Sequence, residues 1–462
     1  MAYVLVTLIA LALILIATDK LNRINKAAVA MFAGVACWLL YIIEGTSFVM
    51  DVHSSEYLSF LSSHSSLGRS AVKEFIASHV FMKYVARCAD IVLFLMATTT
   101  IVEVLNHNGC LDFIGRWLRN CSPRKFIWLS TLVCFVLSAN VDNLVITMLL
   151  LAIVHPLLQE GKAKRLLMAN TIAAACAGGA VTVIGDMTSL KLWCDGLVTP
   201  TNYFATLIAP VLVCQACVTW LISRELPARL QYTEQLPVFR GDDSPLRGWQ
   251  KGLMLFFGIG GLWFIPSFHR ITLLPPFVGA LCVLALLWFV NELVNRKRMG
   301  SDQMVRKRMP MAIQYANMQN MLFFVGLMLM FGAFVESGLA RELMTWTLTH
   351  GANLFAVNLG IGAVAAVVGN VPALIAGIDT FSVDGASVQN AALASEGYFW
   401  PMLSYCATMG GLLFSTSSIA GLVVMRMEKI TFGWYLRHVT PKVLVGFLAG
   451  FAVLAAVVFL FY

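Results

Sequence analysis

The chain has 462 residues, of which 59% are hydrophobic and 12% are charged, and its formal net charge is +8. A soluble domain carries about 25% charged residues, so this composition excludes a soluble globular protein and favours a polytopic membrane protein. The positive charge requires no nucleic-acid partner, because Lys and Arg gather in the cytoplasmic loops of membrane proteins.

Repeated apolar runs predict an all-α membrane protein with about 11–13 transmembrane segments. The first run, Tyr3 to Thr18, lacks a basic segment before it, which favours a membrane span over a cleaved signal peptide. The cysteines show no spacing typical of metal sites, so we expect reduced, buried thiols. The candidate runs are 3–18, 27–44, 84–105, 126–158, 166–196, 203–223, 252–268, 274–294, 319–338, 353–378, 398–425 and 443–461.

The placement of Lys and Arg predicts how these runs are oriented. The positive-inside rule places the basic clusters in the cytoplasm, and the run 126–158 has one at each end, so we expect it to form a hairpin that enters from inside. Residues 342–425 contain no Lys or Arg, so their apolar arms should enter from outside. Halves of opposite orientation are typical of inverted-repeat transporters.

Three matched segments support this repeat. The first match aligns Glu103 in "TTTIVEVLNHNG" with Glu336 in "MFGAFVESG", 233 residues later. The second aligns Asn143 in "ANVDNL" with Asn370 in "VVGNVP", 227 residues later. The Gly pairs 178/179 and 410/411 lie 232 residues apart. Each repeat would hold a re-entrant hairpin and a discontinuous helix. The predicted divisions are N-terminal spans with an outer loop at 45–80 (1–75), the first repeat (76–225), linking spans with a basic cytoplasmic loop (226–318), and the second repeat with the last span (319–462).

Polar residues inside the apolar runs mark a candidate ion site. Asp142 lies in the middle of the first hairpin, where an ionised carboxylate is expected to face a partner, a cavity or an ion. Gly178, Gly179 and Gly185 interrupt the next helix just before Asp186, and irregular backbone at membrane depth is tolerated only where it is buried or lines a cavity. Oxygen atoms there suit a hard cation such as Na⁺, and a buried carboxylate can take a proton when the cation leaves.

Structural explanations compete with this interpretation. Asp142 and Asp186 could be hydrogen-bond acceptors or members of static ion pairs, and Lys191 could neutralise Asp186 permanently. Glu103 and Glu336 lie near span ends, where water or snorkelling accounts for a charge. The small-residue runs could serve close helix packing, and the serines after Gly411 could bond their own helix backbone.

The chain resembles NhaD-type sodium/proton antiporters of the ion transporter superfamily. The segments that carry the resemblance are "LNRINKAAVAMFAGVACWLLY", "TTTIVEVLNHNG", "FVLSANVDNLVITMLL", "AGGAVTVIGDMTSLKLWCDGLVT" and "SYCATMGGLLFSTSSIAGLVVMRMEKITFGWYLRHVT". The resemblance implies exchange of Na⁺ or Li⁺ for H⁺ at a site near mid-membrane, and a homodimer. The residues to which it assigns cation or proton binding are Asp142, Asn143, Asp186, Thr188, Asn370, with Pro372, and the break at 415–418, including Ser417 and Ser418; Na⁺ itself would bind transiently at Asp142 and Asp186.

Four positions depart from the family pattern. Gly369 stands where the second hairpin usually has Asp, and Cys176 stands where Asn usually precedes the Gly pair. Lys191 and Arg87 add positive charge. We therefore leave the stoichiometry and the transported ion open, and treat Lys191, Glu103 and Glu336 as modulating charges. Our hypothesis is that Lys191 competes with the cation for a carboxylate; unchanged ion affinity and pH dependence in Lys191→Ala would refute it.

The preferred prediction is a secondary antiporter that moves Na⁺ or Li⁺ out and H⁺ in, located in the bacterial cytoplasmic membrane. The alternative is an anion transporter, for carboxylates or arsenite, with the same architecture. An intramembrane aspartyl protease would need Gly where Val183 stands, so no enzymatic activity is expected. No GxxxxGK[ST] motif is present, so an ion gradient and not ATP would drive transport, without a cofactor. The last run ends at Tyr462, so no soluble regulatory tail is expected.

Overall fold

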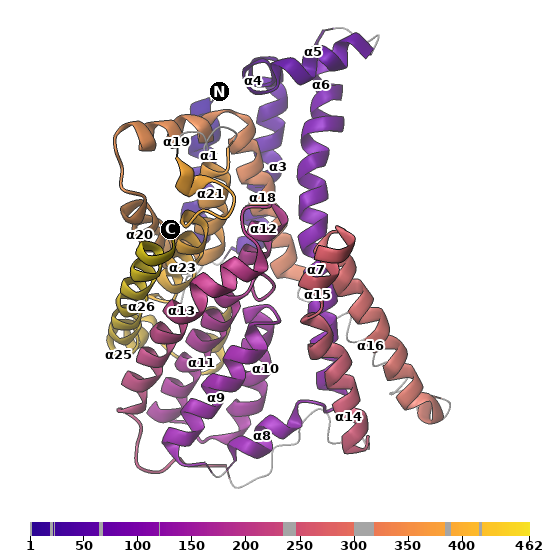
Figure 1. Ribbon diagram of the computed structural model, residues 1–462. Helices are drawn as coiled ribbons and strands as arrows, with labels where there is room; N and C mark the ends of the chain where they lie inside the picture. Colours follow the sequence, from indigo (N-terminus) through magenta and orange to yellow (C-terminus); the bar gives the residue numbers. More distant parts are fainter. Residues whose placement is uncertain are drawn as a thin grey trace.

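The computed structural model describes residues 2–18, 22, 24–63, 68–119, 121–233, 246–299, 318–383, 390–414 and 418–462. Within these ranges the regular structure is helical, with no β-strand and a single isolated bridge between Leu158 and Tyr232. The predicted all-α architecture is therefore confirmed (Figure 1).

Six helices in the described ranges are long and apolar enough to cross a bilayer, and a pair bent by 50° would make a seventh. Among the described residues, the apolar helices Tyr3–Ala17, Asn143–Leu157 and Leu354–Val368 have only 10–17 residues. This explains why fewer helices qualify than the 11–13 segments expected, and it establishes a multi-pass membrane protein. The spanning helices are Lys26–Ile43, Ser70–His107, Pro200–Ser223, Pro276–Arg296, Met318–Glu336 and Thr440–Phe461, and the bent pair is Gly248–Gly260 with Ile265–Thr272.

In its described parts, 45–63 and 68–80, the predicted outer loop is largely helical. Its helices gather at one end of the molecule, far from α8 and α14 (Figure 1), because the rings of Tyr57, Phe60 and His79 pack against the buried Phe75 at centroid distances of 5.4, 5.5 and 5.2 Å. The N-terminal elements are α1 (Ala2–Ala17), α3 (Lys26–Ile43), α4 (Gly45–Val52), α5 (Ser54–Ser63), α6 (Arg69–Phe75), the π-helical η1 (Ile76–Phe81) and α7 (Met82–His107).

The run 126–158 forms the predicted hairpin. Both of its ends lie against one short segment, because the Tyr232 hydroxyl donates to the Cys121 carbonyl (2.7 Å) while the Thr233 amide donates to the Leu157 carbonyl (3.0 Å). The chain therefore returns to the side from which it started. The elements of this half are α8 (Asp112–Leu118), α9 (Pro123–Ser138), α10 (Asn143–Val154), η2 (His155–Leu157), α11 (Lys162–Val181), α12 (Met187–Cys194) and α13 (Pro200–Ser223).

A linking unit follows, and buried amides hold it to α7. Asn108, the C-cap residue of α7, donates to the side-chain oxygen of Asn291 (2.9 Å), and Asn295 donates to that of Asn108 (3.4 Å). Amide pairs of this kind join membrane helices where apolar surfaces give no preference over lipid. The elements are α14 (Gly248–Leu255), η3 (Phe256–Gly260), α15 (Ile265–Thr272) and α16 (Pro276–Met299).

The second half also contains a helix pair and an interrupted helix. A single residue, Gly369, separates α20 from α21, and residues 412–418 separate α23 from α24. The elements are α18 (Met318–Glu336), α19 (Leu339–Thr349), α20 (Leu354–Val368), α21 (Asn370–Phe381), η4 (Ala391–Leu393), α23 (Phe399–Gly411), α24 (Ile419–Met427), α25 (Phe432–His438) and α26 (Thr440–Phe461).

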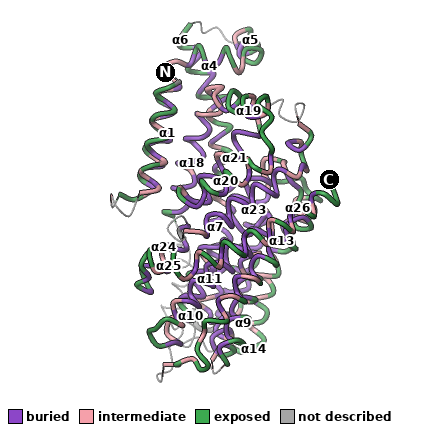
Figure 2. The backbone as a smooth tube through the Cα atoms, turned by 90° about the vertical axis from the view of Figure 1, so that its left-hand side faces the viewer, coloured by how far each residue is buried: buried purple, intermediate pink, exposed green. Residues whose placement is uncertain are grey.

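Small residues bring the central helices into backbone contact. A Cβ placed on Gly326 of α18 would lie 2.5 Å from the carbonyl carbon of Ala30 on α3, so only glycine permits this approach. Figure 2 shows that buried positions fill α11 and α23, whereas outer helices such as α1 and α26 have many exposed positions, among them the apolar Leu11 and Phe459. An apolar exterior is what a lipid environment favours.

Candidate functional site

The tip of the first hairpin places Asp142 at the start of α10. Asp142 is the N-cap residue of this helix, and its Oδ1 accepts a hydrogen bond from the Leu144 amide at 3.0 Å. Its side chain is only 4% exposed, and Oδ2 has no hydrogen-bond donor among the described residues. One oxygen therefore stabilises the helix start, and the other is available to a ligand.

Asp186 lies at the corresponding place where the next helix resumes. It has an extended backbone (φ −144°, ψ 148°) directly before α12, and Thr188 Oγ1 donates to its Oδ2 at 3.0 Å. Ser189 Oγ donates to the Asp186 carbonyl at 2.8 Å. The side chain is 3% exposed, and in the described structure its Oδ1 accepts no hydrogen bond. Asp186 thus also keeps one buried oxygen for a ligand.

Short contacts hold the hairpin tip against the helix break. Thr182 donates to the carbonyl of Ala139, and Ser138 Oγ donates to the carbonyl of Ala175 at 2.6 Å. A Cβ on Gly185 would lie 2.7 Å from the Ser138 carbonyl oxygen. The tip and the break therefore touch through backbone atoms, and a larger residue at 185 would separate them.

The packing of the hairpin tip on the helix break brings Asp142 and Asp186 into one region of the protein. A third member, Asn143, lies beside them, because its Cβ is 3.4 Å from the position that a Cβ on Gly179 would take. The structure places Asp142 and Asn143 at the hairpin tip, and Asp186 and Thr188 at the helix break against which that tip packs. Two buried like charges repel, and either a bound cation or a shared proton relieves that repulsion. Their oxygen atoms are of the type that hard cations prefer.

The second half packs its glycine pair in the same way. A Cβ on Gly411 would lie 3.0 Å from the Cβ of Asn370, just as a Cβ on Gly179 would approach Asn143. A Cβ on Gly410 would overlap the carbonyl oxygen of Gly362 on the neighbouring α20. Asn370 and Asn143 thus have equivalent surroundings, each as the first residue of the second hairpin arm.

Ser418 begins α24 in the manner of an N-cap. Its Oγ accepts a hydrogen bond from the Gly421 amide at 2.9 Å, and its side chain is buried. This contact agrees with the structural alternative that the serine satisfies its own helix, and it leaves the hydroxyl proton for another partner. Ser417, also predicted as a site residue, lies outside the described residues.

We expect Gly369→Asp to destabilise the protein and not to restore a missing carboxylate. Gly369 has φ 121° and ψ 152°, a region that essentially only glycine adopts, so any side chain there costs about 1–3 kcal/mol. Glycine at 369 therefore suits this backbone conformation, which an aspartate would adopt only with strain. Thermal unfolding of purified variants would check this, and Gly369→Ala should lose as much stability as Gly369→Asp. An Asp variant that unfolds at the wild-type temperature would contradict the prediction.

Lys191 is held by carboxylates that the sequence analysis did not single out. Its Nζ lies 2.6 Å from Asp195 Oδ2 and 2.7 Å from Asp379 Oδ1, and the side chain is 1% exposed. Arg87 adds a weaker contact of 3.8 Å to Asp195. The single positive charge of Lys191 is therefore shared between these two carboxylates. Asp379 could have been suspected from its isolation in the apolar stretch "LIAGIDTF".

Glu336 ends α18 beside a cavity of about 160 Å³. The Tyr84 hydroxyl donates to its Oε1 at 2.8 Å, and His53 Nε2 lies 2.6 Å from its Oε2. Asp195, Asp379 and Arg87 line the same cavity. Glu103 lies elsewhere on α7, where its carboxylate is 3.9 Å from Nε2 of His107 one turn later.

The contact between His53 and Glu336 predicts a pH-dependent stability. His53 lies in the outer segment, and the hydrogen bond from its ring to Glu336 raises the pKa of His53 above its ordinary value of about 6.5. The stabilisation is then complete below about pH 6.5 and is lost as the pH rises through the higher folded-state pKa. Unfolding temperatures measured across this range should fall more steeply in the wild type than in His53→Gln. Parallel curves for the two proteins would show that this contact contributes nothing.

Comparison with known proteins identifies the family. Residues 13–400 match the family described as citrate transporters, CitMHS. Sodium/proton antiporter 2 of Arabidopsis thaliana is 26% identical over 446 residues, covering 96% of this chain and 97% of that protein. Sodium/proton antiporter 1 of the same plant is 29% identical over 374 residues, covering 80% of this chain but 62% of that longer protein.

A bacterial relative supports the resemblance drawn from the motifs. The Na⁺/H⁺ antiporter NhaD of Alkalimonas amylolytica is 26% identical over 390 residues, which cover 79% of this chain and 76% of that protein. The similarity to NhaD-type proteins is thereby confirmed. Since the family match extends over most of its length, this multi-pass membrane protein belongs to the CitMHS family of transporters.

Proposed function

We propose that this protein exchanges Na⁺ or Li⁺ for H⁺ across a membrane, at a site formed by Asp142 and Asp186. The observation that carries the proposal is that Asp142 and Asp186 are both buried where the hairpin tip packs on the helix break, and that each has one oxygen to which no described group donates. The cation binds between the two carboxylates, and after it leaves, a proton takes its place. Coupling arises because one site cannot hold both ions, and no further cofactor takes part.

The charges around the site favour a cation as the transported ion over the anion of the alternative prediction. An anion needs an uncompensated positive charge, whereas Lys191 is already paired with Asp195 and Asp379. The sodium/proton antiporters among the relatives point in the same direction. The citrate-transporter description of the family keeps an anion in the experiment as the competing outcome.

Alternating access would come from two inverted repeats. Equivalent packing of Gly179 on Asn143 and of Gly411 on Asn370 supports the repeat, as does the break that follows each glycine pair. Transporters of this design move one part of each repeat around a fixed central site. We place the protein in the bacterial cytoplasmic membrane as a homodimer, although relatives also occur in a plant.

The test is dye-reported ΔpH in everted membrane vesicles that contain the wild-type protein. NaCl, LiCl or KCl is added after respiration has acidified the vesicles, at values from about pH 6.5 to about 9. We expect Na⁺ and Li⁺ to dissipate the gradient, since either ion enters as protons leave. A well-expressed protein that responds to no cation would refute the proposal, and citrate uptake by the same vesicles would then favour the anion alternative.

A further inference from the structure

A buried carboxylate ends the helix that follows the second break. Glu428 is the C-cap residue of α24, and its side chain is completely buried. Its Oε1 lies 2.6 Å from His155 Nδ1, and its Oε2 lies 3.7 Å from Lys164 Nζ. A buried carboxylate is strongly unfavourable without charged or hydrogen-bonding partners, so Glu428 depends on these two side chains.

The three residues lie at the ends of helices whose opposite ends carry or lead to predicted site residues. His155 follows α10, which begins at Asp142; Lys164 is in the first turn of α11, which leads to the break before Asp186. Glu428 follows α24, which begins at Ser418. The 12 residues of α10 span roughly 18 Å as a stiff rod, and α10 packs against both α11 and α24. Contacts at one end of these helices therefore set the positions of their other ends.

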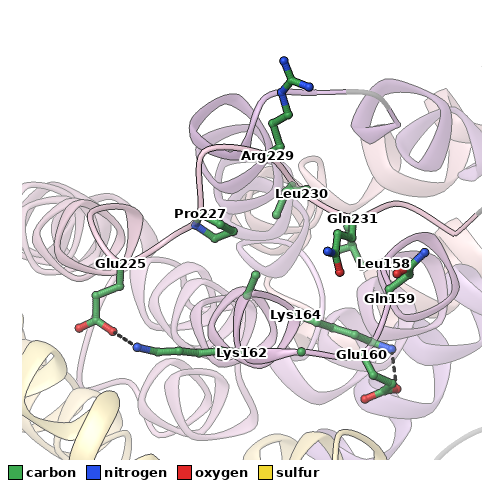
Figure 3. Close-up of a pocket in the computed structure, with 12 residues that line it drawn as sticks. Leu158, Gln159, Glu160, Lys162, Lys164, Glu225, Pro227, Arg229, Leu230 and Gln231 are labelled. Atoms are coloured by element: carbon green, nitrogen blue, oxygen red, sulfur yellow. Dashed lines mark hydrogen bonds and ion pairs between the residues drawn. The ribbon is translucent and has the colours of Figure 1, made fainter.

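A metal ion is a poorer explanation of this cluster. The ligand atoms of His155, Glu160 and Glu428 lie within 4.8 Å of one another, which would suit a metal. However, Lys164 Nζ lies 3.0 Å from Glu160 and already supplies the positive charge, and it holds the pKa of the Glu160 carboxyl below its usual range. Figure 3 shows this pair at the edge of a pocket of about 350 Å³.

The first half has a similar contact. Asp195 is the C-cap residue of α12, the helix that follows the first break, and it binds Lys191, which also binds Asp379 of α21. In both places an ionic contact joins the helix after a break to the second arm of the hairpin from the other half: α12 to α21, and α24 to α10. The same arrangement at two sites indicates that these contacts align the parts of the ion site.

We propose that Glu428 is a positioning residue for cation exchange, which acts through His155 and Lys164 to fix Asp142 and Ser418 relative to each other. The inference rests on the proposed function. Glu428 itself touches no ion in transit. Without the charge of Glu428, the C-terminal ends of α10 and α24 separate. The oxygen atoms of Asp142 and Ser418, at the opposite ends of these helices, then shift relative to each other. The cation therefore binds more weakly, while the maximal rate of exchange changes less.

The experiment compares Glu428→Gln, His155→Gln and the double variant in the vesicle assay, with the half-saturating Na⁺ concentration and the maximal rate measured separately. We expect each single substitution to raise the half-saturating concentration about tenfold, as couplings between contacting charged groups do. The double variant should be no worse than Glu428→Gln, because both substitutions remove one contact. Glu428→Asp, which keeps the charge, should recover part of the affinity.

Glu225→Gln is the matched control. Glu225 pairs with Lys162 and Lys442 on the same face of the protein (Figure 3 shows the Lys162 contact), but it does not join α10 to α24. Glu225→Gln should keep the half-saturating Na⁺ concentration of the wild type. Wild-type affinity in Glu428→Gln, strictly additive effects in the double variant, or an equal loss in Glu225→Gln would each overturn the inference.

If Glu428→Gln does not accumulate in the membrane, the affinity of His155→Gln tests the inference instead, since His155 is partly exposed. A wild type without exchange refutes the proposed function instead.

Discussion

Asp142→Asn is expected to abolish Na⁺-driven proton movement while the protein still folds. Asparagine can keep the N-cap hydrogen bond to Leu144, so the start of α10 survives. The substitution removes the charge that a cation needs, and loss of one partner of a buried charge contact costs about 3 kcal/mol, or about a hundredfold in affinity. Vesicle ΔpH measurements with NaCl and LiCl should therefore show no response.

Two further variants make this result specific. Asp90→Asn removes a partly buried carboxylate of α7 and should keep the wild-type response. Thr188→Val removes the hydroxyl that donates to Asp186 and should weaken Na⁺ binding less than the loss of a charge does. A normal Na⁺ response in well-expressed Asp142→Asn would mean that the carboxylate only caps its helix.

Gly178→Ala is expected to destabilise the protein and to eliminate exchange. A Cβ at this position would overlap the carbonyl oxygen of Phe135 and lie 3.0 Å from two further backbone atoms of Phe135. Backbone atoms cannot rotate aside as a side chain can, so α9 and α11 must move apart. We expect a loss of about 1–3 kcal/mol or more, together with displacement of the Asp142 tip from Asp186.

Gly360→Ala provides the control for this substitution. Gly360 also lies within a helix, α20, but a Cβ there would meet no atom within 4 Å. Removal of a helical glycine should be neutral, or stabilising by up to about 1 kcal/mol. Thermal unfolding of the two purified variants measures the difference. Equal unfolding temperatures would show that the contact between α9 and α11 has room for a methyl group.

The sequence determined the features that depend on local chemistry. The basic clusters at both ends of 126–158 predicted a hairpin, and Tyr232 and Thr233 indeed contact its two ends. Glycines followed by Asp186 predicted a break inside a helix, which lies at residues 182–186. These features could be read because apolar length, loop charge and glycine each act through solvation or backbone freedom near their own position.

The sequence also predicted the central members of the candidate site. An aspartate in an apolar run must find a partner or a ligand, and Asp142 and Asp186 are buried together. Their binding of Na⁺ and H⁺ stays a prediction for the vesicle experiment. The high serine content of segment 45–80 predicts a polar loop. The prediction missed the helices because only a few aromatic residues in this segment pack on Phe75.

Which charges pair depends on how helices from distant parts of the chain pack together. Lys191 is five residues from Asp186 in the sequence, yet it binds Asp379 on α21. His155 likewise contacts Glu428, which lies 273 residues later in the chain. The backbone angle of Gly369 likewise depends on how α20 and α21 join. From the sequence alone, this glycine indicates only the absence of an aspartate. The physical reason is that a buried charge must pair with whatever opposite charge the packed helices bring within reach, and helix packing is a property of the whole chain.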